Sequence, residues 1–104
     1  MTALDALPAV LDRIDRDLDA SLDRLFALLR IQSVSTDPAF AAYCRTAAEH
    51  VATDLRSLGL EASVRPTAGH PIVIGKTPAG KSGNGKTDGQ TNREAPRVLF
   101  YGHY

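Results

Sequence analysis

Residues 37–59 read DPAFAAYCRTAAEHVATDLRSLG and carry the signals of a complete helix. Asp37 has a carboxylate that can accept hydrogen bonds from the first free amides of a helix, and Pro38 follows at a position where proline costs no hydrogen bond. Gly59 suits the left-handed backbone that commonly ends helices. Apolar residues recur at helical spacing between these signals, at Phe40, Tyr43, Ala47, Val51, Leu55 and Leu58. The sequence therefore predicts a helix that ends at Leu58, with this face in the core.

The residues before this helix predict a longer one over residues 4–30. Its apolar residues alternate in steps of three and four, at Leu4, Leu7, Leu11, Ile14, Leu18, Leu22, Leu25 and Leu29. Regular helix is expected from about Pro8 onward. The stripe also suits a coiled coil, but it lasts for only about four heptads. Packing of the stripe against the protein's own sheet is therefore the favoured interpretation.

Strands are predicted after the second helix. Residues 60–65 alternate between apolar and polar, residues 67–71 form a turn, and residues 72–74 are a short apolar strand. Residues 77–95 are rich in Gly and Lys, which predicts a flexible loop. Residues 97–101 read RVLFY, a continuous apolar run typical of a strand buried on both faces.

These elements predict an α/β fold in which two helices precede the strands of a mixed sheet. A strand buried on both faces needs neighbours and covering helices, which these residues supply only in part. We therefore expect residues 1–104 to be the opening part of a larger domain, with the loop at 77–95 inside it.

Composition excludes few classes of protein. The chain has 104 residues and a formal net charge of zero, so whole-chain electrostatics give no support for nucleic-acid or membrane binding. Cys44 is the single cysteine, which favours a reducing compartment. Aspartates interrupt every candidate apolar run near the N-terminus, so we expect no signal peptide or membrane span. The expected location is the cytoplasm.

Residues 80–87 read GKSGNGKT and match the phosphate-loop pattern at every fixed position. That chemistry needs a buried strand leading directly into the loop and a helix leading out of it. Residues 76–79, which include Pro78, separate the loop from the preceding strand, and residues 88–96 lack apolar periodicity. A solvated basic loop is the favoured interpretation, and a nucleotide site is the alternative.

The histidines and the cysteine differ in what their surroundings indicate. His103 follows the apolar run after Gly102, where side chains at the carboxyl end of a strand in an α/β sheet face the ligand crevice and an imidazole can hold a metal. Spacing alone leaves a surface histidine as the simpler interpretation. His70 in its turn is expected to be structural, His50 to lie at the edge of the helix face, and Cys44 to be a small core residue.

Three stretches together resemble the N-terminus of the carnosinase-like dipeptidases, which belong to the co-catalytic zinc peptidases together with aminoacylases and desuccinylases. They are LLRIQSVSTDPAFAAYCRTAAEHVATDLRSLGLEASV at 28–64, AGHPIVIGK at 68–76 and PRVLFYGHY at 96–104. The first zinc ligand of that family lies in a Gly-His-x-Asp motif, and His103 falls on its histidine. Tyr104 is typical of the dipeptidase branch, whereas threonine or serine is commoner in deacylases and carboxypeptidases. The loop at 77–95 is longer than the family pattern implies.

The resemblance implies hydrolysis of a small peptide at two zinc ions that share a carboxylate and a water, with a glutamate as general base. It places only His103 of this chain at the metal and implies no catalytic or cofactor-binding residue here. The chain alone is therefore expected to be inactive, and the resemblance allows a homodimer through a domain outside it. The alternatives are a deacylase or carboxypeptidase of the same superfamily, or a non-enzymatic helical interaction module.

Overall fold

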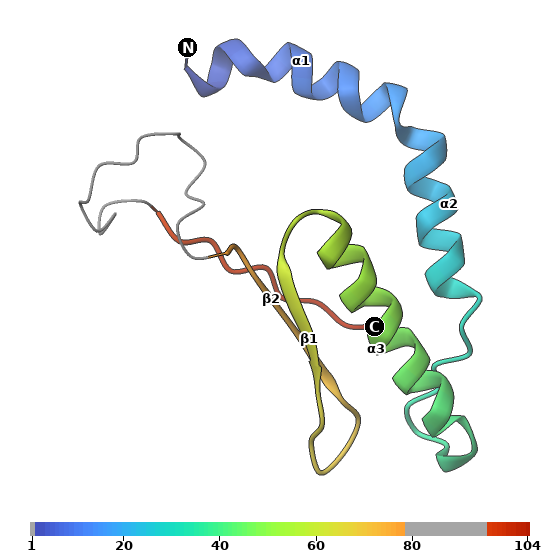
Figure 1. Cartoon of the computed structure of the whole chain (residues 1–104). Helices are drawn as coiled ribbons and strands as arrows, with labels where there is room; N and C mark the ends of the chain where they lie inside the picture. Colours follow the sequence, from blue (N-terminus) through green and yellow to red (C-terminus); the bar gives the residue numbers. More distant parts are fainter. Residues whose placement is uncertain (1, 79–95) are drawn as a thin grey trace. The chain divides into compact units, whose positions relative to one another are not determined.

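The computed structural model describes residues 2–78 and 96–104, which form two compact units, Met1–Ile31 and Gln32–Tyr104 (Figure 1). The first unit holds two helices, and the second combines a helix with a hairpin, so the described residues are mixed α/β. The elements in chain order are α1 (Ala3–Arg16), α2 (Leu18–Leu29), the 3₁₀ turn η1 (Pro38–Phe40), α3 (Ala41–Ser57), β1 (Glu61–Arg65) and β2 (Ile72–Lys76). Most of the predicted loop at 77–95, including the phosphate-loop pattern, lies outside the described residues.

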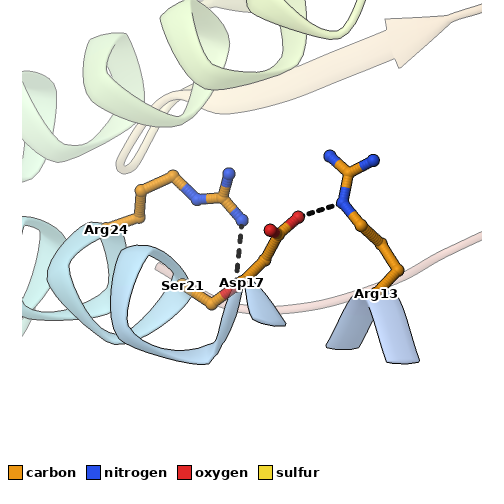
Figure 2. Close-up of polar contacts among 4 residues, drawn as sticks. All are labelled: Arg13, Asp17, Ser21 and Arg24. Atoms are coloured by element: carbon orange, nitrogen blue, oxygen red, sulfur yellow. Dashed lines mark hydrogen bonds and ion pairs between the residues drawn. The ribbon is translucent and has the colours of Figure 1, made fainter. Parts of the chain in front are cut away.

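The first unit is two helices where the sequence predicts one. The break falls at Asp17, whose backbone leaves the helical region at φ −97° and ψ 7°. Aspartate is a weak helix former, and here its carboxylate accepts a hydrogen bond from Nε of Arg13 (Figure 2). The amide of Asp17 still donates to the carbonyl of Arg13 at 3.0 Å. The prediction was therefore right about the extent of the helical region and wrong about its continuity.

Helix α1 begins at Ala3, ahead of the predicted start near Pro8, because Thr2 and Asp5 form a capping box. The amide of Asp5 donates to Oγ1 of Thr2 at 3.3 Å, and the amide of Thr2 donates to the Asp5 carboxylate at 2.8 Å. Two amides that a helix leaves without partners are satisfied in this way. Pro8 lies inside the helix, where its ring nitrogen donates no hydrogen bond.

The capping box gives α1 a pH dependence. Hydrogen bonds from the backbone and side chain of Thr2 hold the pKa of Asp5 below its ordinary value of 3.8. A carboxylate with a lowered pKa stabilises the folded state above that ordinary value and ceases to do so as pH falls through its folded pKa. We expect the Thr2 and Asp5 amide signals in NMR spectra to report fraying of α1 as pH falls from about 5 to about 2.

Asp5→Asn is the control for this titration, because an amide side chain does not ionise. The variant should lose the acid-induced change of these two amide signals. The capping assignment would be contradicted if the amide signals of the variant and of the parent chain titrated alike.

The apolar stripe of the first unit is exposed. Its side chains range from 38% exposed at Leu22 to 80% at Leu4, and neither α1 nor α2 has a buried residue. Packing of this stripe against the sheet stays a prediction. Within residues 2–78 and 96–104, every helix falls short of the length and apolarity that crossing a membrane requires.

The second unit confirms the local signals around α3. The carboxylate of Asp37 accepts from the amide of Ala39 at 2.9 Å, and Pro38 opens the 3₁₀ turn that leads into the helix. At the other end Gly59 has φ 85°. Its amide donates to the carbonyl of Arg56 at 2.9 Å, and the amide of Leu60 donates to that of Leu55 at 3.2 Å. This bond pair is a Schellman motif, which ends the helix and directs the chain into β1.

Strands β1 and β2 pair antiparallel, from Glu61 opposite Lys76 to Arg65 opposite Ile72. The first strand begins one residue after the predicted start, and the second continues two residues beyond the predicted end. Nε of Arg56, near the end of α3, donates to the backbone carbonyl of Ala62 in β1 at 3.1 Å. The sheet of the described residues is therefore an antiparallel pair, whereas the predicted sheet was mixed.

Helix α3 packs on one face of the hairpin through small side chains (Figure 1). The buried residues of the described chain are Cys44, Ala47, Ala48 and Ala52. A Cβ atom added at Gly75 of β2 would come within 2.9 Å of Cδ1 of Leu55, so the helix and the strand approach closely. Side chains of this size allow such an approach, because larger ones would hold the two elements apart.

The predicted core face of α3 is partly wrong. Two of its members are exposed, Tyr43 at 47% and Leu58 at 72%, whereas Cys44 and Ala48 are buried. The buried residues of α3 lie about one position along the helix from the predicted ones. Small side chains occupy these buried positions because the helix and the hairpin pack closely together. Large side chains on the predicted face lie at its rim.

The prediction for residues 97–101 is also wrong in this structure. They form no strand, and Val98, Leu99, Phe100 and Tyr101 are between 73% and 91% exposed. An apolar run becomes a buried strand only where neighbouring strands and covering helices exist. The described sheet offers this segment no strand pairing.

Candidate functional site

His103 lies in the irregular C-terminal segment and is exposed. Its Nε2 is 3.3 Å from the hydroxyl of Tyr101, within hydrogen-bond distance. The two rings meet edge to face, with centroids 5.2 Å apart and planes inclined at 78°. The imidazole is therefore accessible to solvent, and the aromatic neighbour two residues earlier sets its orientation.

Tyr104 attaches this segment to the rest of the second unit. Its hydroxyl donates a hydrogen bond to the backbone carbonyl of Pro71, at the end of the turn between the two strands. Burial raises the pKa of Tyr104, and the nearby Cys44 thiol raises it further. The hydroxyl therefore keeps its proton at neutral pH and remains a donor. Cys44 is 1% exposed, which confirms its prediction as a core residue.

The turn that receives Tyr104 is itself held by hydrogen bonds. Nε2 of His70 donates to the backbone carbonyl of Ser35 at 2.7 Å, which ties the turn to the connection before α3. Thr67 accepts from the amide of Gly69 at 3.0 Å and donates to the carbonyl of His70 at 2.6 Å. His70 thus makes structural contacts, as predicted, and His50 is half-buried on α3.

The metal predicted at His103 can be tested against the donors that surround it. No group of three His, Cys, Asp or Glu side chains in residues 2–78 and 96–104 is placed to hold a metal ion. A catalytic zinc ion takes three protein ligands, and His103 supplies one imidazole. His103 therefore stands outside any such group within the described residues, and the zinc ligand stays a prediction.

A shallow hollow of about 410 Å³ lies along the hairpin and the end of α3. Its lining includes the cations Arg56, Arg65 and Lys76 and one acid, Glu61. The hydrogen-bonding groups of both arginines are partly engaged, Arg56 with Ala62 and Arg65 with the hydroxyl of Ser63 at 3.3 Å. None of the residues around His103 lines this hollow, which therefore adds nothing to that site.

The metal role expected of His103 stays a prediction, and the sequence gives no sign of the contact that Tyr104 makes. The bond from Tyr104 to Pro71 spans 33 positions of the chain. A contact of this range depends on how the hairpin folds, and no local pattern of residues encodes it. From the sequence alone, Tyr104 is expected only to indicate the dipeptidase branch of the family.

Comparisons of this chain with protein-family models, with curated proteins and with solved structures find no match.

Proposed function

We propose that this chain is the N-terminal part of the catalytic domain of a zinc-dependent dipeptidase, in which His103 provides one metal ligand. The observation that carries the proposal is the sequence PRVLFYGHY at 96–104. In it, an apolar run typical of a buried strand leads directly into a glycine and a histidine. The family that this stretch resembles has its first zinc ligand at that position.

The geometry of His103 supports a role as a ligand. The imidazole is exposed, and the flanking residues restrict it, since Tyr101 lies against its ring and Tyr104 is bonded to Pro71. A neutral imidazole is the commonest protein ligand of zinc, and its second nitrogen is normally held by a hydrogen bond that fixes the ring. A bound zinc pair would activate a water and polarise the scissile carbonyl.

The remaining parts of the proposed enzyme lie outside this chain. They are the carboxylate shared by the two metals, the glutamate base, the other ligands and the residues that select the peptide. The domain through which the proposed homodimer would form also lies outside this chain. The chain alone is proposed to be inactive, and the single cysteine favours a cytoplasmic location.

The test is the substrate preference of the longer protein whose N-terminal part is this chain. Hydrolysis of a set of dipeptides should exceed that of the matching N-acetyl amino acids by at least about tenfold, because a site that hydrogen-bonds a free amino group rejects substrates that lack one. Treatment with a chelator, followed by zinc, should remove and then restore the activity.

The other outcomes of this test distinguish the dipeptidase from the alternative functions. Preference for N-acyl amino acids would support the deacylase of the same superfamily and contradict the dipeptidase. Failure to hydrolyse either class with zinc present would contradict both enzymes. The exposed apolar stripe of α1 and α2 would then favour the helical interaction module.

A further inference from the structure

We propose that Tyr104 is a positioning residue that fastens residues 96–104 to the second unit and thereby fixes the place of His103. The proposal rests on the proposed function only in treating His103 as the functional group. The attachment itself is a feature of this chain and can be tested without metal or substrate.

The exposure of the segment identifies Tyr104 as its point of attachment. Residues 96–103 are all exposed, with Leu99 and Phe100 at 91%, whereas Tyr104 is half-buried. The hydroxyl of Tyr104 donates to the carbonyl of Pro71, and Cys44 is close enough to contribute to the raised pKa of Tyr104. The contact therefore combines one hydrogen bond with burial of an aromatic side chain, the two means by which tyrosine holds a loop.

The carbonyl of Pro71, which accepts the hydrogen bond from Tyr104, belongs to a part of the chain that other contacts also fix. Pro71 directly follows His70, which is bonded to Ser35, and it directly precedes Ile72 at the start of β2. Three stretches of chain thus meet at this point: the connection before α3, the turn between the strands, and the C-terminal segment. Tyr104, bonded to Pro71, is therefore held in place as long as these three stretches keep their arrangement.

The anchor acts on His103 through the backbone. Adjacent Cα atoms are held about 3.8 Å apart across a peptide bond, so fixing Tyr104 confines His103 to a short arc. The contact of Tyr101 with the His103 ring then selects one orientation within that arc. Tyr104 thus fixes the position of the His103 imidazole, and the exposed Tyr101 fixes its orientation.

The experiment compares three variants of the full chain, Tyr104→Ala, Tyr104→Phe and Tyr101→Ala. Two quantities are measured, the rate at which a small disulfide reagent labels Cys44 and the ¹⁵N order parameter of the His103 amide. Tyr104→Ala should raise the labelling rate roughly tenfold or more and lower the order parameter below about 0.6, the flexible range. Tyr104→Phe keeps the ring and loses the donor, so it should lower the order parameter while Cys44 stays protected.

Tyr101→Ala is the matched control, since it removes a tyrosine of the same segment that is 84% exposed. It should leave the Cys44 labelling rate and the His103 amide order unchanged. Unchanged order in folded Tyr104→Ala overturns the proposal. If circular dichroism shows that Tyr104→Ala has lost α3, the Tyr104→Phe variant decides, and unchanged order there overturns it equally. Neither measurement depends on hydrolysis, so failure of the dipeptidase proposal and failure of the anchor are distinguishable.

Discussion

In the proposed dipeptidase, replacement of His103 by alanine is expected to lower zinc-dependent dipeptide hydrolysis by roughly a thousandfold, because loss of a metal ligand removes several kcal/mol of transition-state stabilisation. The assay uses the proposed longer enzyme, at saturating dipeptide, with metal content measured on the same samples. The imidazole is exposed, so its truncation leaves no cavity in the described structure and the fold should persist.

His50→Ala is the control for His103→Ala. It removes another imidazole of the second unit, one that is half-buried on α3 and has no expected part in metal binding. Its activity and zinc content should match the parent protein. Parental activity in His103→Ala, with zinc content unchanged, would mean that this histidine is not a ligand.

Enlargement of Ala48 to leucine is expected to destabilise the second unit by about 1–3 kcal/mol, the usual range for overpacking a closely packed core. Ala48 is fully buried on α3, and the helix lies close to the hairpin, since a Cβ atom added at Gly75 would come within 2.9 Å of Cδ1 of Leu55. The added side chain must push the helix from the strands. Urea unfolding followed by circular dichroism measures the loss.

The matched control is Ala42→Leu, the same change on the same helix at an exposed position. Leucine and alanine are both good helix formers, so this variant should unfold within about 0.5 kcal/mol of the parent chain. Equal unfolding midpoints for the two variants would show that Ala48 is not at a tightly packed contact.

Signals confined to a few residues could be predicted from the sequence. The carboxylate of Asp37 reaches an amide two residues away, and Gly59 adopts its positive φ for bonds to the preceding turn. Such interactions need no knowledge of the remaining chain. The capping of α1 by Thr2 is equally local, but a pattern of apolar residues does not reveal it because the capping side chains are polar.

Features that depend on distant residues were predicted less well. The apolar pattern of α3 favoured Tyr43 for the core, but the close hairpin admits Cys44 and Ala48 in its place. Residues 97–101 have the composition of a buried strand, yet composition does not supply the neighbours with which a strand pairs. At the candidate site, the metal role of His103 stays a prediction, whereas the contact of Tyr104 with Pro71 becomes visible only with the folded hairpin.

The hydrogen bond from Arg56 to Ala62 joins the last turn of α3 to the backbone of β1. An exposed strand edge is a template on which another strand can add, from this chain or from another molecule. The carbonyl of Ala62 already accepts a hydrogen bond from the Arg56 guanidinium, so a strand that required this carbonyl would first have to displace the arginine. Arg56 thus competes with strand addition at this one point of the sheet.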